Sequence, residues 1–182
     1  MLLFYFHGFA QNTITEGAAL LFKNVKTKLP VADKNSIYKK INFSLSKDKK
    51  QFAAVGEDAE YPFVAFVYPT DLNKDGKEEI FIVFGNSYTS GHTGSSVVMY
   101  IKDKSGSFQP NLGFPGVTPD AMPTKNLGYP DLMIGGPGFE WPVWRWNGKE
   151  YNFYKKIKEK DLLKMKAISI EDLSKTYASS IK

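Results

Sequence analysis

The sequence contains no cysteine and only one arginine among its 182 residues. Without thiols the chain can form neither disulfides nor thiolate metal sites, and it can carry neither thiol catalysis nor a lipid-modified cysteine. Of the 24 basic residues, 23 are lysines and the other is Arg145. The flat guanidinium is the preferred group for bidentate recognition of bases and phosphates. The net charge of +5 therefore indicates a lysine-rich surface that favours solubility and argues against a nucleic-acid partner.

Long apolar runs are also absent. No stretch approaches the roughly 20 apolar residues of a membrane-spanning helix, which excludes an integral helical membrane protein. Hydrophobic residues make up 42% of the chain and charged residues 24%, as in ordinary globular domains. Aromatic residues reach 15%, and most are Phe and Tyr, which favour half-buried strands. The composition predicts one domain of mainly β structure.

The first ten residues, MLLFYFHGFA, are typical of the end of a secretion signal. Leu2–Phe6 is apolar, and Gly8 and Ala10 stand at the small-residue positions that precede a cleavage point. The alternative is a buried first strand. We expect export: residues 1–10 are a signal-peptide remnant, residues 11–182 form a single β-rich domain, and the protein is secreted or periplasmic.

Helical patterns are confined to the two ends of this domain. Apolar residues recur at three- or four-residue intervals over 14–29, after a capping-box spacing between Thr13 and Glu16. Pro30 is expected to end that helix. A second capping signal predicts a short helix over 169–180.

Strand patterns dominate from residue 61 onward. The stretches YPFVAFVY, EEIFIVFG and SSVVMYIK are rich in aromatic and branched side chains, and Gly, Asp, Asn and Ser clusters separate them. In the lysine-rich segment 31–60, the alternation of Ile41, Phe43 and Leu45 with polar residues indicates a further strand.

A weak internal repeat divides the β region into two units. GKEEIFIVFG, from Gly76, matches GYPDLMIGG, from Gly128, and a Gly-rich loop, an aromatic strand and a polar turn follow each. Repeats of about this length are typical of propeller blades, but a propeller needs at least about four. We expect antiparallel sheets from two blade-like repeats, at about 61–108 and 125–154, which pack on each other or on a short helix at each end.

Residues 71–79, DLNKDGKEE, carry the motif with the clearest chemistry. Its first, third and fifth side chains supply oxygen atoms, and Gly76 permits a sharp reversal of the chain. Ca²⁺ prefers six to eight such oxygen ligands. The expected ligands are Asp71, Asn73, Asp75, the Lys77 carbonyl and Glu79. An EF-hand has a glutamate at position 12, where this chain has an apolar strand residue, so we expect a strand–loop–strand site. The alternative is a turn that its acids merely cap.

The pattern DxNxDGxxE, followed by an apolar strand that ends in FG, resembles the FG-GAP/VCBS repeat of integrin-like β-propeller blades. The resemblance covers about residues 61–154. It implies a blade fold and a structural Ca²⁺ ion held at the five positions named above. The ninth position is Glu79 here, where that family more often has Asp. The second unit retains only Asp131 of the ligand positions, which implies no metal there.

Two Gly-rich loops, 85–96 and 135–142, follow equivalent strands of the two units and are expected at the same end of the sheets. Such loops on a rigid sheet commonly bind ligands. The residues expected to do so are Tyr88, His92, Phe139 and Trp141. Trp144 and Trp146 share one strand face, which favours a place in the core over a sugar-stacking platform.

Three functional hypotheses follow. The first is an exported, non-enzymatic, calcium-stabilised module that binds a glycan, the cell wall, or an extracellular or periplasmic protein. The second is a proteinaceous inhibitor of a cell-wall hydrolase such as lysozyme, because loop 85–96 combines Ser, Gly and His residues in the manner of an inhibitory loop. The third is a hydrolase with His92 as its base, but the chain has no G-x-S-x-G elbow.

Overall fold

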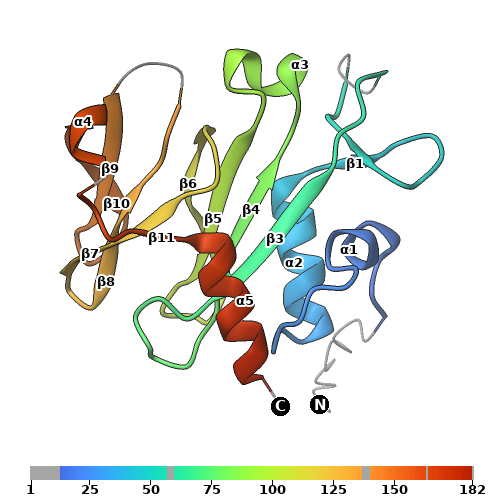
Figure 1. The fold of residues 1–182 in the computed structure, drawn as a ribbon. Helices are drawn as coiled ribbons and strands as arrows, with labels where there is room; N and C mark the ends of the chain where they lie inside the picture. Colours follow the sequence, from blue (N-terminus) through green and yellow to red (C-terminus); the bar gives the residue numbers. More distant parts are fainter. Residues whose placement is uncertain (1–12, 57–59, 137–139, 163, 182) are drawn as a thin grey trace, which may run out of the picture.

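Two antiparallel sheets, each made of strands that follow one another in the chain, form the centre of the computed structural model (Figure 1). It describes residues 13–56, 60–136, 140–162 and 164–181. The first sheet has the order β3-β4-β5-β6, with strands Ala65–Thr70, Glu79–Phe84, Ser96–Lys102 and Phe108–Pro115. The second has the order β10-β9-β8-β7-β11, where β7 to β11 are Asp120–Asn126, Tyr129–Met133, Glu140–Trp146, Tyr151–Lys158 and Ile168–Ser169.

The remaining elements surround these sheets. A two-stranded sheet joins β1 (Ser44–Leu45) to β2 (Phe52–Ala53). The helices are α1 (Glu16–Leu21), α2 (Val31–Ile41), α3 (Ser87–Ser90), α4 (Glu159–Leu162) and α5 (Ile170–Ser180), and the 3₁₀ helix η2 covers Gly91–Thr93. The predicted fold class, mainly β with antiparallel sheets and a short helix at each end, is confirmed. None of the helices in the described ranges is long and apolar enough to cross a membrane.

Each predicted unit corresponds to one meander of four antiparallel strands. The first runs from residue 65 to 115 and the second from 120 to 158, with β11 added at the β7 edge. These bounds place β6 in the first unit and β7 in the second. The three strand patterns read from the sequence correspond to β3, β4 and β5. The predicted signal remnant, residues 1–10, lies outside the described residues.

The larger core lies between the two sheets. Phe81 and Val83 of β4 face it together with Leu132 of β8, and Ile170 of α5 closes one end. Trp146 is buried in this core, and the half-buried Trp144 stacks on Phe114 with ring centroids 4.7 Å apart. The tryptophan pair therefore belongs to the core, as its shared strand face predicts.

A second core lies on the opposite face of the first sheet. Ile80 and Ile82 of β4 point into it, because side chains alternate along a strand. Helices α1 and α2 cover this face with Leu21 and Ile37. Strand β4 is thus buried on both faces, which explains its unbroken apolar sequence.

The N-terminal helix is shorter than its apolar spacing predicts. Helix α1 begins after Thr15, whose hydroxyl accepts a hydrogen bond from the Ala18 amide at 3.4 Å, and ends at Leu21. The predicted Thr13–Glu16 capping box does not form. Asn24 adopts a left-handed φ of 61°, which helix geometry excludes and which turns the chain away.

Pro30 begins a helix and does not end one. It is the N-cap residue of α2, which occupies Val31–Ile41 in the segment where the sequence indicates only a strand. A helix start tolerates proline, because the first amide groups have no partner within the helix. The predicted strand around Ile41–Leu45 shrinks to Ser44–Leu45, and Asn42 (φ 59°) caps α2 in the left-handed conformation.

The C-terminal helix forms as predicted. The Ser169 hydroxyl accepts hydrogen bonds from the amides of Glu171 and Asp172 at the start of α5. Helix α5 packs against β3, and Ile170 and Leu173 contact the core between the sheets. The two open sheets therefore pack on each other and on helices near the two ends of the domain, as expected.

We predict that Phe81→Ala lowers the free energy of unfolding by about 3–5 kcal/mol, because Phe81 is 0% exposed between the sheets and its loss leaves a cavity. The matched control is Phe66→Ala on the neighbouring strand, where the ring is 54% exposed; we expect a loss below about 1 kcal/mol. Urea denaturation measures both. Equal losses would contradict the assignment of the core.

Candidate functional site

The 71–79 loop joins β3 to β4, and its own polar side chains wind it. The Gly76 amide donates to Asp71 Oδ2 at 3.1 Å, and the Asp75 amide donates to Asn73 Oδ1 at 3.1 Å. The Lys77 amide donates to Asp75 Oδ1 at 2.8 Å. Gly76 takes a φ of 83°, the left-handed conformation that the predicted reversal requires. Three of the predicted ligands are therefore drawn into one turn.

Asp71 has a second oxygen with a different environment. Its Oδ1 atom is buried and has no hydrogen-bond partner within the described structure. A buried polar atom without a partner is costly, and more so if it carries charge. This atom is therefore a free oxygen ligand at the first position of the loop.

Both carboxylate oxygens of Glu79, the fifth predicted ligand, already have hydrogen-bond partners. Glu79 is the first residue of β4 and is 2% exposed. Its Oε2 atom accepts a hydrogen bond from the Leu72 amide at 2.7 Å, and its Oε1 atom accepts one from the Tyr129 hydroxyl at 3.0 Å. Burial raises the pKa of this carboxyl to about 7; the two hydrogen bonds oppose the rise and the nearby Asp75 and Asp71 add to it. Glu79 thus connects the loop to β8 of the second sheet.

The structure separates the predicted ligands into two groups. Asp71, Asn73, Asp75 and the Lys77 carbonyl belong to the turn and could hold a cation, whereas both oxygens of Glu79 have other partners. Across the ranges that the structure describes, no three His, Cys, Asp or Glu side chains are grouped so that they could hold a metal. Any metal held by this loop would depend on the amide and carbonyl oxygens as well as on carboxylates.

Asp131 is the residue of the second unit that matches Glu79, and it is buried differently. It is 0% exposed, and Arg145 contacts it with Nε at 2.8 Å and a terminal nitrogen at 2.7 Å. The Thr124 hydroxyl donates a further hydrogen bond at 2.5 Å. Although burial raises the pKa of Asp131, these hydrogen bonds and the guanidinium charge lower it below its usual value. The Arg145 guanidinium therefore supplies the positive charge that balances the Asp131 carboxylate.

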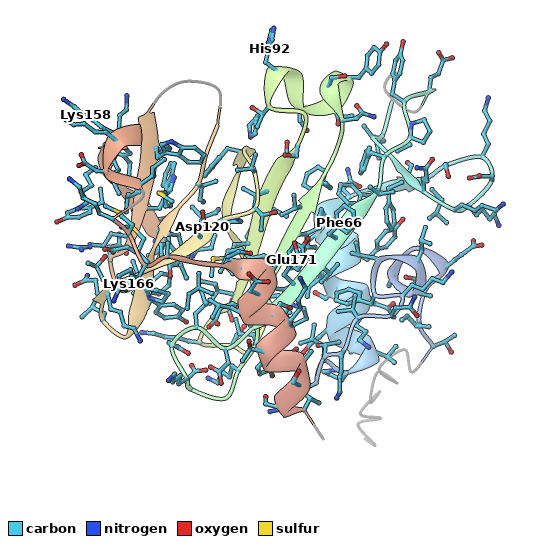
Figure 2. All side chains as sticks on the ribbon, viewed as in Figure 1. Phe66, His92, Asp120, Lys158, Lys166 and Glu171 are labelled. Carbon is cyan, nitrogen blue, oxygen red and sulfur yellow. The ribbon has the colours of Figure 1, made fainter. Side chains whose placement is uncertain are left out.

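Tyr88 and His92, two of the four predicted ligand-binding residues, lie on the α3–η2 loop. Tyr88 is 67% exposed and stacks on Tyr61, with ring centroids 3.8 Å apart and planes 13° apart. His92 is exposed at the outer end of the loop (Figure 2). The Asn86 side chain fixes this geometry: it accepts from the Tyr88 amide at 2.9 Å and donates to the Pro62 carbonyl at 3.2 Å. Sequence reasoning missed Tyr61, since no local pattern indicates a stacking partner 27 positions away.

Trp141, the third, does not join them. Its ring is half-buried over Gly135, where an added Cβ atom would lie 2.1 Å from the ring. It packs with Met133 and Val143 on the outer face of the second sheet. The sequence predicts an exposed Trp141, but the glycine beneath the ring leaves room for it to pack. Phe139, the fourth, lies outside the described residues.

The serines of loop 85–96 have partners of their own. Ser90 Oγ and Ser96 Oγ lie 2.9 Å apart, and the Ser95 hydroxyl donates to the Gly116 carbonyl at 3.0 Å. No hydrogen bond in the described part of the chain joins His92 to a serine. The geometry therefore offers no support for a Ser–His pair.

Comparison with known proteins finds no family model, no curated protein and no solved structure that matches this chain. The strand order and register show two antiparallel meanders, and the resemblance of these units to propeller blades stays a prediction.

We predict that Asp131→Asn destabilises the protein by about 2 kcal/mol at pH 7, because it leaves Arg145 without its carboxylate. The folded-state pKa of Asp131 is lowered, so its contribution is present above the unfolded value of about 3.9 and is lost as the pH falls through the folded value. The difference from wild type should therefore shrink below about pH 4.

The matched control for this measurement is Asp161→Asn, which removes an exposed partner of Lys164. We expect a change within about 0.5 kcal/mol at either pH. Urea denaturation across the pH range measures both variants. A pH-independent loss in Asp131→Asn would contradict a role for the charge.

Proposed function

We propose that the protein is a calcium-stabilised binding module, exported from the cell. The observation that carries this proposal is the 71–79 loop, in which Asp71, Asn73 and Asp75 accept hydrogen bonds from amides of the same loop while Asp71 Oδ1 stays buried without a hydrogen-bond partner. A hard divalent cation would supply the missing positive charge.

The chemistry of the donor set favours Ca²⁺. Carboxylate, amide and backbone carbonyl oxygens are the ligands it takes, with water completing the shell. Asp71, Asn73, Asp75 and the Lys77 carbonyl would hold the ion. Glu79 would support the site without binding the ion, because the hydrogen bond that it accepts from the Leu72 amide fixes the chain next to Asp71. The ion's role is to fix the turn between β3 and β4.

The Tyr61–Tyr88 pair supports the binding part of the proposal. The Asn86 hydrogen bonds fix the backbone at Tyr88, and stacking on Tyr61 holds the Tyr88 ring, so less side-chain freedom remains to be lost on binding. Aromatic rings that present an apolar surface and a polar hydroxyl suit sugars and protein partners alike. The ligand proposed for this surface is a glycan, the cell wall, or an extracellular or periplasmic protein.

A second candidate function is inhibition of a cell-wall hydrolase. One observation favours it: the α3–η2 loop projects beyond the ends of the strands, with His92 at its outer end (Figure 2). A protruding, internally hydrogen-bonded loop has the shape that an enzyme cleft would accept.

We predict that Ca²⁺ at a hundredfold excess over its Kd stabilises the protein by about 2.7 kcal/mol, a rise in Tm of about 5–10 °C, whereas Mg²⁺ and chelation do not. Asp75→Ala should abolish this rise, because it removes a ligand and the hydrogen bond to the Lys77 amide.

The matched control for the calcium melt is Asp103→Ala. Asp103 caps another turn through the amides of Ser105 and Ser107 but stands outside the calcium pattern. Its loss should lower Tm and leave the calcium-dependent rise intact. A wild-type protein without any rise at millimolar Ca²⁺ would mean that the 71–79 loop is only a turn.

The two candidate functions give opposite results in a lysozyme assay. An inhibitor should stop cell-wall hydrolysis at stoichiometric concentration, and His92→Ala should weaken inhibition by tenfold or more while Lys47→Ala leaves it unchanged. A binding module should leave the enzyme active and retain the polysaccharide itself, with Tyr88→Ala as the weakening variant. Failure of both assays would exclude a cell-wall ligand for this loop.

A further inference from the structure

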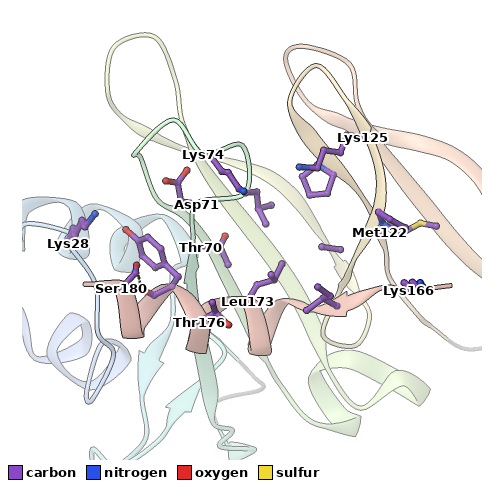
Figure 3. A pocket seen from close by; sticks show the side chains of 16 residues that line it. Lys28, Thr70, Asp71, Lys74, Met122, Lys125, Lys166, Leu173, Thr176 and Ser180 are labelled. Atoms are coloured by element: carbon purple, nitrogen blue, oxygen red, sulfur yellow. Dashed lines mark hydrogen bonds between the residues drawn. The ribbon is translucent and has the colours of Figure 1, made fainter. Parts of the chain in front are cut away.

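A pocket of about 590 Å³ opens between the 71–79 loop, β7, the start of β8 and helix α5 (Figure 3). Its volume falls within the range of small-molecule sites in proteins. The lining residues come from segments far apart in the chain, from Lys28 to Ser180. It lies apart from the Tyr61–Tyr88 pair and from the α3–η2 loop.

The charged groups around this pocket are nearly all positive. Four lysines line it, from four different segments, and Asp71 is the single acid. The chain as a whole has 24 basic and 19 acidic residues, so the pocket is enriched in positive charge beyond the composition. The four are Lys28, Lys74, Lys125 and Lys166.

These four lysines lack an ion-pair partner among the described residues, although the Glu78 carboxylate accepts a hydrogen bond from the Lys28 backbone amide at 2.8 Å. None of the ion pairs in the described part of the chain includes any of the four. One carboxylate oxygen of Asp71 accepts a hydrogen bond from the Gly76 amide of its own loop, and the other is buried. Lys28 Nζ lies 5.6 Å from the ring centroid of Tyr177, which also lines the pocket. The ammonium groups are therefore available to an anion.

Apolar side chains stand between the lysines. Leu72, Ala121 and Met122 are buried in the wall, whereas Ile168 is 52% exposed and Leu173 of α5 is half-buried. The apolar area that remains in water gains free energy when a ligand covers it. A bare inorganic anion would leave it uncovered, whereas an uncharged apolar compound would leave the lysines without a counter-charge.

We propose that this pocket binds a small organic anion, a single acidic head group on an apolar body. Lysine acts as a point charge with rotatable donors and does not impose the bidentate geometry of arginine. The site should therefore select for negative charge beside an apolar body and accept a carboxylate or a sulfate alike. The inference extends the proposed binding function to a defined ligand class, and it does not depend on whether the 71–79 loop holds Ca²⁺.

Calorimetric titration with decanoate, 1-decanol and inorganic phosphate tests the inference. Decanoate should saturate a single site, 1-decanol should bind at least tenfold more weakly, and phosphate should give no saturable binding. Added salt should weaken decanoate binding, because it screens exposed charges.

Three variants assign the binding to this pocket. The double variant Lys125→Gln/Lys166→Gln should lower decanoate affinity about five- to tenfold. The matched control Lys47→Gln/Lys104→Gln removes the same charge from exposed turns outside the pocket and should leave affinity unchanged. Thr176→Trp adds bulk on the exposed side of α5 that lines the pocket and should abolish binding. Thermal melts of each variant confirm that it folds.

The inference is overturned by equal affinities for decanoate and decanol, by equal losses in the two double variants, or by no decanoate binding at all. Its failure is separable from that of the calcium proposal. A calcium-dependent rise in Tm without decanoate binding removes the pocket ligand alone, and decanoate binding without that rise removes the calcium site alone.

Discussion

Both faces of the first sheet are apolar, and neither can be left in water. Strand β4 shows the constraint most directly, since Phe81 and Val83 point to one side while Ile80 and Ile82 point to the other. The second sheet covers one face and α1 and α2 cover the other. This requirement explains why helices accompany the two sheets: α1 and α2 cover an apolar face of the first sheet that the second sheet does not reach.

The same position in the two units also shows how the fold buries an acid. Glu79 and Asp131 both stand near the start of the second strand of their sheet. Glu79 faces the other sheet and accepts hydrogen bonds from the Leu72 amide and the Tyr129 hydroxyl. Asp131 faces outward and pairs with the Arg145 guanidinium. The difference comes from what covers each face. The second sheet packs on the face of β4 that carries Glu79, whereas Asp131 and Met133 lie on the face of β8 that is turned away from the first sheet. Only the first arrangement is coupled to a turn rich in oxygen ligands.

How far the sequence predicts the structure depends on how local the signal is. Strands β3 to β5, the Ser169 cap and the winding of the 71–79 turn depend on neighbouring residues, and the sequence shows them. Pro30 does not reveal helix α2 in the sequence, because proline is compatible both with the end of one helix and with the start of the next. The packing of the sheets on each other follows from the small number of units. The sequence predicts that the sheets pack on a C-terminal helix, but it does not indicate that this helix packs against β3.

The site was predictable in its residues and less so in its geometry. The spacing of Asp71, Asn73 and Asp75 predicts a sharp turn rich in side-chain oxygens, but it does not reveal that the Glu79 side chain reaches Tyr129. Tyr61 and the lysine-lined pocket arise from segments brought together by tertiary packing, and no local pattern indicates them. The Gly- and Pro-rich sequence around Trp141 predicts an exposed loop residue, yet the absence of a side chain at Gly135 leaves room for the Trp141 ring to pack over it.

Arg145 has a consequence for the outside of the molecule. The single guanidinium of the chain is occupied by Asp131 and lies 3.7 Å from the ring centroid of Tyr154. The positive side chains that remain for other molecules are primary amines, apart from the two histidines when these are protonated. Acylation of amines, a reaction that leaves guanidinium groups untouched, would therefore reverse the sign of the protein's net charge while the Asp131–Arg145 pair stayed in place. The charge that this protein presents to its surroundings is chemically separate from the charge that stabilises its interior.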